Sequence, residues 1–373
     1  MSKPKSPANV VVLGGGGAGA RIARTLAQQL GGAKVTLIEA REYYLHYPGT
    51  LRMLVTAEPK LEDKVLISYD RLFANTTGTV VHGTATSIVR STDQRGGHVS
   101  LDSGEQVPYD ALVIASGSVW EGPLAFPRAK AAALEHISEW RENIKNAQGV
   151  AIVGGGLVGA EIAGEIRDIY PDKKMALVQR ENHLFVSRYP DKYRIDADKR
   201  WKQRNISLVF EDEIEEIPSF PASGVMTKKG AVIEADLVIP TRGGRPNTAV
   251  VSTLGPGLLS EEGYIKVDPH LQVKGLPGIF AAGDVLDWQE VKQVAKVPGH
   301  VSVVVANVKS FIRNKRQTAI YNGTFELIVV TNGANGGVAF IDKLWGLRFG
   351  NTFAKMIKSK DLFIGPTNKA LGH

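Results

Sequence analysis

The chain of 373 residues contains no cysteine. This absence excludes disulfide scaffolds, zinc–cysteine and iron–sulfur sites, thiol nucleophiles and redox-active cysteine pairs. The eight histidines include no pair spaced three or four residues apart, so a metal site on a helix is not expected. We therefore predict no metal ligands, and any redox chemistry must proceed without a thiol.

Signals for export and membrane insertion are absent as well. The first residues, MSKPKSP, contain no apolar core of a secretory signal, and Ser2 excludes N-myristoylation, which requires glycine. No stretch approaches the ~18 apolar residues of a membrane-spanning helix. These absences predict a cytoplasmic chain that is soluble or bound peripherally to a membrane, such as a lipid droplet or the mitochondrial surface.

The net charge is +7, from 45 Lys and Arg against 38 Asp and Glu. A basic chain can attract nucleic acid, anionic lipid or phosphorylated ligands. No long basic block and no basic stripe interleaved with stacking aromatics is visible. A specific nucleic-acid partner is therefore not expected, and a DNA-binding effector is kept as an alternative of another class.

Glycine is more frequent than the usual ~7%, with 40 residues, and much of the excess lies in two similar stretches. Residues 9–23 read NVVVLGGGGAGARIA, and residues 149–163 read GVAIVGGGLVGAEIA. Each is an apolar strand pattern, then G-x-G-x-x-G, then a helical pattern, at an offset of 140 residues. The repeat predicts an α/β chain with two Rossmann-like dinucleotide-binding domains.

The spacing of the glycines follows from phosphate binding. The first glycine permits a tight turn, the second admits the pyrophosphate, and the third lets the helix pack on the strand with its N-terminus toward the phosphates. The predicted cofactor-binding residues are Gly14, Gly15, Gly16, Gly17, Ala18 and Gly19 in the first copy, and Gly154, Gly156, Leu157, Val158 and Gly159 in the second.

A second strand follows each motif and ends in a residue that suits a ribose. Lys34–Glu39 places Glu39 20 residues after Gly19, where a carboxylate accepts hydrogen bonds from a ribose diol, and Ala40 and Arg41 continue this site. Lys174–Gln179 places Gln179 and then Arg180 at the matching point. An amide and a guanidinium do not repel a 2′-phosphate, so the second site is expected to accept NADPH at least as well as NADH.

Three further segments each show a strand pattern followed by a turn. Residues 111–118 (ALVIASGS) predict a small-residue turn at Ala115, Ser116 and Gly117, on which a cofactor can lie. Residues 237–247 (LVIPTRGGRPN) form a similar pattern, and residues 278–285 (GIFAAGDV) deliver Asp284 after Gly283. Two nucleotide sites in one chain indicate two cofactors that exchange electrons.

These motifs together resemble the two-dinucleotide-binding flavoproteins, in which an NAD(P)H domain is inserted into an FAD domain. The resemblance implies that the first motif and Glu39 hold the adenosine half of FAD, and that Asp284 meets its ribityl or pyrophosphate part. Gly243 matches the second linker, although Arg242 stands where threonine is usual. The implied domains are an FAD domain (8–120 and 243–310), an NAD(P)H domain (121–242) and a C-terminal segment (311–373).

Within that superfamily the chain is most similar to the apoptosis-inducing-factor-like group, which includes ferroptosis suppressor protein. The similarity rests on residues 153–174 (VGGGLVGAEIAGEIRDIYPDKK), 67–73 (ISYDRLF), 300–308 (HVSVVVANV) and 359–365 (SKDLFIG). It implies NAD(P)H-dependent reduction of lipid quinones through bound flavin, with FAD contacts at residues 14–18, Arg52, Val80 and Asp284.

The absence of cysteine distinguishes between the classes of flavoprotein reductase that share these motifs. Disulfide reductases and sulfide:quinone reductases need thiols and are excluded. Direct transfer from flavin remains, to a quinone, to a small radical such as monodehydroascorbate, or to a redox protein such as ferredoxin. We predict an NAD(P)H:quinone oxidoreductase and keep the other two acceptors as alternatives.

The candidate catalytic residues are Glu161, Lys292 and His300. Glu161 either stabilises the N-terminus of its helix or orders the nicotinamide near the flavin. Lys292, Lys296 and His300 either stabilise a reduced, anionic flavin or form an ordinary helix start.

Two residues of the segment YYLHYPGTLR were also considered. His46 is more plausible as a structural hydrogen-bonding group than as a proton donor. Arg52 is expected to neutralise charge near the FAD pyrophosphate.

Residues 342–365 form a basic amphipathic segment, in which aromatic and aliphatic side chains recur at helical spacing between lysines and arginines. Such a segment is expected either to lie on a membrane, where a lipid quinone is met, or to pack on the FAD domain or a homodimer partner. Its apolar members are Trp345, Phe349, Phe353, Met356 and Ile357.

Overall fold

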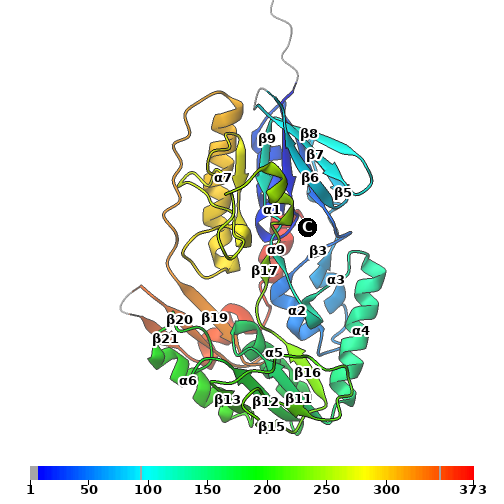
Figure 1. The fold of residues 1–373 in the computed structure, drawn as a ribbon, viewed down its shortest axis with the longest axis vertical. Helices are drawn as coiled ribbons and strands as arrows, with labels where there is room; N and C mark the ends of the chain where they lie inside the picture. Colours follow the sequence, from blue (N-terminus) through cyan, green and yellow to red (C-terminus); the bar gives the residue numbers. More distant parts are fainter. Residues whose placement is uncertain (1–6, 93–94, 344–345) are drawn as a thin grey trace, which may run out of the picture.

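The computed structural model describes residues 7–92, 95–343 and 346–373. Two parallel sheets dominate it, one above the other in Figure 1. The first sheet has the order β18–β9–β1–β2–β5, and its strands are β1 (Asn9–Leu13), β2 (Lys34–Glu39), β5 (Thr79–His82), β9 (Ala111–Ile114) and β18 (Ile279–Ala281). The central strands are continuous apolar runs because helices or loops cover both faces of the sheet.

The second sheet repeats this plan with the order β13–β12–β11–β16. Its strands are β11 (Gly149–Val153), β12 (Lys174–Gln179), β13 (Ser207–Phe210) and β16 (Leu237–Pro240), all parallel. A glycine turn leads from β1 into α1 (Gly17–Gln29) and from β11 into α5 (Leu157–Ile169). The predicted α/β fold with two Rossmann-like units is confirmed.

Both helices approach their strands as the third glycine requires. A Cβ added at Gly19 would lie 1.8 Å from the carbonyl oxygen of Gly14, and one at Gly159 would lie 2.0 Å from that of Gly154. No side chain fits at either point, so each helix packs directly on its turn.

Smaller elements surround the two sheets. The antiparallel strands β6 (Ala85–Arg90), β7 (Gly97–Leu101) and β8 (Gln106–Tyr109) lie between β5 and β9 in sequence. The chain passes from one sheet to the other at β10 (Ser118–Val119) and returns at β17 (Arg245–Pro246), and these strands pair antiparallel. The predicted boundaries near 120 and 243 stay a prediction.

The remaining elements lie between or outside the sheets. They are β3 (Tyr44–Leu45), α2 (Tyr47–Met53), α3 (Leu61–Val65), β4 (Leu66–Ile67), α4 (Lys130–Asn146), α6 (Asp191–Lys202), β14 (Val225–Met226), β15 (Val232–Ile233) and α7 (Val297–Ile312). Helix α7 packs on α1 beside the first sheet.

The C-terminal part contacts both units. Residues 313–326 lead from α7 to an antiparallel sheet of β19 (Leu327–Thr331), β20 (Gly337–Ile341) and β21 (Leu347–Phe349), and β19 packs on α5. The chain then forms α8 (Asn351–Ala354), a π-helical turn (Lys355–Ser359) and α9 (Ile364–Leu371), which returns to α1.

The helical spacing predicted over residues 342–365 is realised only in part. Phe349 belongs to a strand that pairs with β20, and Trp345 lies outside the described residues. The pairing of β21 overrides the local pattern, because a strand beside β20 satisfies its main-chain groups. Among the helices of the described residues, none is both long and apolar enough to span a bilayer.

Candidate cofactor sites

The first glycine turn carries a carboxylate where the sequence predicted one. The N–H of Gly15 donates to Oε2 of Glu39 over 2.5 Å, and the N–H of Arg41 donates to Oε1 over 2.9 Å. Nothing lies within 4 Å of a Cβ added at Gly16, so the helix N-terminus faces open space. This arrangement fits a dinucleotide phosphate beside a ribose-binding carboxylate.

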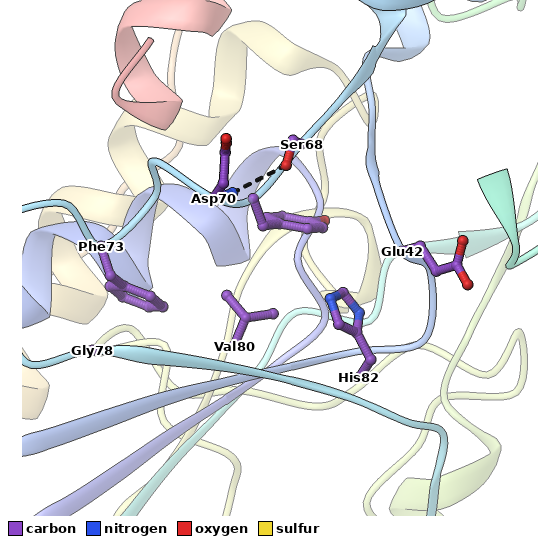
Figure 2. A pocket seen from close by; sticks show the side chains of 8 residues that line it. Glu42, Ser68, Asp70, Phe73, Gly78, Val80 and His82 are labelled. Carbon is purple, nitrogen blue, oxygen red and sulfur yellow. Dashed lines mark hydrogen bonds between the residues drawn. The ribbon is translucent and has the colours of Figure 1, made fainter.

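A hollow of about 320 Å³ lies beside this turn (Figure 2). It is lined by Glu42, Ser68, Tyr69, Asp70, Phe73, Gly78, Val80 and His82. The hydroxyl of Tyr69 donates to the carbonyl of Gly15, which joins the hollow to the glycine turn. Val80, which the resemblance assigned to FAD, therefore lines a hollow beside the first glycine turn, and its contact with FAD stays a prediction.

The second glycine turn repeats the geometry with a neutral side chain. The N–H of Gly155 donates over 2.9 Å to Oε1 of Gln179, whose amide nitrogen donates to the carbonyl of Phe185. Nothing lies within 4 Å of a Cβ added at Gly156, and the exposed Arg180 follows at the same edge. The turn with Gly154, Leu157, Val158 and Gly159 therefore suits a nucleotide whose ribose needs no carboxylate.

The predicted small-residue turns gather around the N-terminus of α1. A Cβ added at Gly14 would lie 2.4 Å from the carbonyl oxygen of Ala115, and Gly117 has a φ of +70°. The hydroxyl of Ser118 donates to Oδ2 of Asp284 over 3.1 Å, and burial raises the pKa of this carboxyl. Ser116 is fixed by a bond from its hydroxyl to the carbonyl of Asn247.

An ion pair holds the segment before β17, where the chain returns to the first sheet. Nε and Nη2 of Arg242 donate to the two oxygens of Glu121 over 2.8 and 2.7 Å. The guanidinium of Arg242, which replaces the usual threonine, thus pairs with the segment that follows β10. Nothing lies within 4 Å of a Cβ added at the neighbouring Gly243.

Arg52 has a partner within the protein. Its Nε and Nη2 each donate over 2.9 Å to the carboxylate of Glu165 on α5, and Nη2 also donates to the carbonyl of Ser359. All three groups are buried. The contact with the FAD pyrophosphate stays a prediction, while the structure shows a link between α2, α5 and the C-terminal part.

Glu161 is buried rather than solvated at its helix end. Its Oε1 accepts from the N–H of Thr331 over 2.8 Å and forms an ion pair with Lys358 over 2.5 Å. In the sequence, Lys358 falls within the basic segment 342–365 without a predicted role of its own, and no prediction singled out Thr331. The one available signal was the SKDLFIG stretch, which begins directly after Lys358.

The candidate groups after the Gly283–Asp284 turn are all engaged inside the protein. Lys292 donates to the carbonyls of Leu286 and Trp288, and burial lowers the pKa of its ammonium group. Lys296 donates to the carbonyls of Thr324 and Phe325 and pairs with Glu326.

His300 bonds through both ring nitrogens, to Gly283 and Glu290. Both ring nitrogens of His300 thus have protein partners, and its predicted role toward the flavin stays a prediction. Two carbonyls accept from the ammonium group of Lys292, which has a third N–H, so its predicted contact with flavin stays a prediction as well.

His46 is a structural group, as the sequence favoured. Its Nε2 lies 2.7 Å from the carbonyl oxygen of Leu362, and burial lowers the pKa of the imidazole to about 4.

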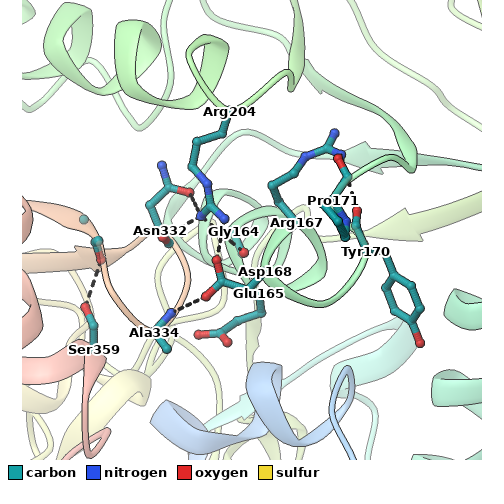
Figure 3. A network of polar contacts seen from close by, with 12 residues as sticks. Gly164, Glu165, Arg167, Asp168, Tyr170, Pro171, Arg204, Asn332, Ala334 and Ser359 are labelled. Atoms are coloured by element: carbon teal, nitrogen blue, oxygen red, sulfur yellow. Dashed lines mark hydrogen bonds and ion pairs between the residues drawn. The ribbon is translucent and has the colours of Figure 1, made fainter.

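A polar network fixes the C-terminal sheet on α5 (Figure 3). Nη1 of Arg204 donates to the main-chain and side-chain oxygens of Asn332 over 2.6 and 2.8 Å. Asp168 pairs with Nη2 of Arg204 and accepts from the N–H of Ala334 over 2.7 Å. These bonds place Thr331, next to Asn332, against Glu161.

The sequence matches the family described as pyridine nucleotide-disulphide oxidoreductase over residues 8–307. The chain belongs to this family. The pyridine nucleotide-disulphide oxidoreductases bind FAD and NAD(P)H, as the geometry of the two turns leads one to expect. The 373 residues of this member contain no cysteine, so they form no redox-active disulphide of their own.

Individual relatives agree with this assignment. The chain is 41% identical over 320 residues to the FAD-dependent oxidoreductase FVFD30 of Flammulina velutipes, covering 86% of the chain and 99% of the relative. It is 31% identical over 380 residues to apoptosis-inducing factor homolog A of Dictyostelium discoideum, covering 95% and 90%. Human ferroptosis suppressor protein 1 is 25% identical over 371 residues, covering 97% and 95%. The resemblance to this group is confirmed.

Solved structures show the same fold. The sulfide:quinone oxidoreductase of Aquifex aeolicus superposes with a TM-score of 0.76 at 18% identity, covering 98% of this chain and 91% of that one. A ferredoxin reductase from Rhodopseudomonas palustris superposes with a TM-score of 0.70 at 18% identity, covering 92% and 91%.

Proposed function

We propose that this oxidoreductase is an FAD-dependent NAD(P)H:quinone oxidoreductase. The observation that carries the proposal is the combination of two complete dinucleotide turns with a chain that has no thiol. FAD, when bound, supplies the two-electron carrier between a reduced nicotinamide and the acceptor. A quinone takes two electrons and two protons. Reduced flavin and water would supply both, so the reaction needs no thiol relay and no dedicated acid.

The chain's own residues bind the two cofactors and orient them. Glu39 holds a ribose at the first turn, and Asp284 holds the ribityl or pyrophosphate part of the flavin. The N-termini of α1 and α5 face the phosphates. Glu161, held by Lys358 and Thr331, orders the nicotinamide end at the start of α5.

Anaerobic reduction followed by selective reoxidation tests this function. The yellow holoenzyme is reduced with NADPH or NADH, and a ubiquinone analogue, ferricyanide or ferredoxin is then added in parallel. We expect the quinone to restore the flavin absorbance faster than ferredoxin at equal concentration. Reoxidation by ferredoxin but not by the quinone would contradict the proposal.

A second candidate is reduction of a redox protein. The fold shared with a ferredoxin reductase and the net charge of +7 favour an acidic protein partner. The ferredoxin arm tests this alternative directly. A small radical acceptor and a DNA-binding role have no structural observation in their favour.

We further propose that the second site accepts NADPH. Gln179 has the place that Glu39 has in the first site, so no carboxylate repels a 2′-phosphate, and the exposed Arg180 adds a positive charge. Arg180→Ala should raise the KM for NADPH about tenfold and leave the KM for NADH unchanged in steady-state kinetics. A wild-type preference for NADH above about tenfold would contradict the proposal.

We also propose that the C-terminal part meets a membrane or a second copy of the chain. Met356 is 71% and Leu347 is 41% exposed, and lysines 355 and 360 lie nearby in sequence. Co-sedimentation with anionic vesicles at low and high salt tests the membrane, and gel filtration tests the dimer. Truncation after Asp342 is unsuitable, because it removes the bonds of Lys358 and Ser359.

A further inference from the structure

A series of hydrogen bonds from Gly283 through His300 and Glu290 to Tyr321 holds the turn that carries Asp284. The N–H of Gly283 donates to Nδ1 of His300 over 3.3 Å, and Nε2 of His300 lies 2.9 Å from Oε1 of Glu290. The hydroxyl of Tyr321 donates to Oε2 of Glu290 over 2.6 Å. The rings of His300 and Tyr321 also pack edge to face, with centroids 4.6 Å apart. Residues from the turn, from α7 and from the segment after α7 thus form one support.

The protonation of this support follows from its partners. A main-chain N–H can only donate, so Nδ1 of His300 must be bare and the proton must lie on Nε2, facing Glu290. Burial acts to raise the pKa of Glu290, but the hydrogen bonds from His300 and Tyr321 and the positive charge of Lys292 act to lower it, and the pKa lies below its ordinary value. Glu290 accepts hydrogen bonds from both His300 and Tyr321 and so fixes the orientation of the imidazole.

The supported turn lies against the first cofactor site. Gly283 has a φ of +79°, and a Cβ added there would lie 3.3 Å from the Cβ of Ala18 at the start of α1. Asp284 accepts a hydrogen bond from Ser118 on β10. A shift of Gly283 would therefore move the Asp284 carboxylate relative to the N-terminus of α1, where the FAD phosphates are expected.

We propose that His300 is a positioning residue for FAD. Its Nδ1 fixes the N–H of Gly283, while Glu290 and Tyr321 hold the imidazole, so that the Asp284 carboxylate is already in place when FAD binds. Tyr321 belongs to the segment 313–326 and brings the C-terminal part into this support. The inference rests on the FAD binding within the proposed function and is independent of the electron acceptor.

Two substitutions of His300 distinguish the role of Nδ1 from the role of Nε2. In His300→Asn an amide oxygen takes the place of Nδ1, so the acceptor for Gly283 is kept and the contact with Glu290 is lost. In His300→Gln the amide reaches the place of Nε2, so the contact with Glu290 is kept and the acceptor for Gly283 is lost. Both variants lose the ring that packs on Tyr321, which makes them a matched pair.

The test is the Kd for FAD, measured by titrating each apoprotein and following flavin fluorescence. We expect a Kd about threefold above that of wild type for His300→Asn, whose side chain Glu290 no longer holds, and a Kd about tenfold above that of wild type for His300→Gln. Equal Kd values in the two variants would overturn the proposal. A flavin that binds normally but is not reoxidised by quinone would refute the proposed acceptor alone.

A milder variant keeps the proposal testable if neither substitution folds, as judged by circular dichroism. Tyr321→Phe removes one hydroxyl and leaves the bond between His300 and Glu290 in place. We expect its Kd for FAD to rise about threefold, because Glu290 then holds the imidazole less firmly. An unchanged Kd would overturn the role of the support.

Discussion

Single side chains in this oxidoreductase are bound by partners far away in sequence. Glu161 forms an ion pair with Lys358 and also accepts from the N–H of Thr331. In Glu161→Gln the amide oxygen still accepts from Thr331, but the charge facing Lys358 is gone. We expect turnover with NADPH to fall about tenfold while the protein stays folded by circular dichroism. Unchanged turnover would limit Glu161 to a structural role.

His46 makes stability depend on pH. Its pKa is lowered by burial from 6.5 to about 4, so between these values the unfolded chain binds a proton that the folded chain does not. Folding stability therefore falls as the pH drops through this window, by about 3 kcal/mol in all.

His46→Gln keeps a donor for the carbonyl of Leu362 but cannot titrate. We expect its melting temperature to fall less than that of the wild type between pH 7 and pH 4.5. An equal fall in both proteins would exclude His46 as the cause.

At the scale of one element, α5 serves as the support of the C-terminal sheet. A Cβ added at Gly164 would lie 2.5 Å from the nitrogen of Gly333 and 2.7 Å from the Cα of Asn332. Gly164→Ala should therefore push the turn between β19 and β20 away, at a cost of about 1–3 kcal/mol, and loosen the contact between Thr331 and Glu161. Lower turnover and a lower melting temperature are expected.

Gly365 on α9 provides the matched control. Nothing lies within 4 Å of a Cβ added there, and its φ is not positive. Gly365→Ala should leave the melting temperature unchanged or raise it slightly. If both alanine variants behave alike, the close packing of α5 against the sheet is not the cause.

At the scale of the whole molecule, the buried ion pair of Arg52 and Glu165 joins α2 to α5. Removing one partner leaves an uncompensated buried charge, which costs about 3–5 kcal/mol, whereas replacing both by apolar residues is often tolerated. Arg52→Met should therefore lower the melting temperature strongly, and the double variant with Glu165→Leu should recover most of it. A double variant as unstable as the single one would refute this.

The FAD content of the same double variant tests the predicted phosphate contact of Arg52. If Arg52 touches the pyrophosphate, the variant loses FAD although its melting temperature recovers. Full retention of FAD would show that the ion pair is the main role of Arg52.

The features that could be predicted from the sequence are those whose residues lie close together along the chain. The glycine turns, Glu39 and Gln179 each lie within about one βαβ unit, because turn geometry and phosphate binding fix their spacing. The pairs that hold the molecule together have no such local signature. Arg52 and Glu165 are 113 residues apart, Glu161 and Lys358 are 197 apart, and His46 and Leu362 are 316 apart.

The return of the chain end to both units has a consequence for the gene. Lys358, Ser359 and Leu362 supply partners to Glu161, Arg52 and His46, yet no strand of either parallel sheet lies beyond residue 281. A stop codon just before position 358 would therefore spare every strand of both sheets, yet it would remove the cation beside Glu161 and one carbonyl partner each of Arg52 and His46. During synthesis the strands of both sheets are made before residues 358–362, so the contacts of these residues are added to sheets that can already have formed.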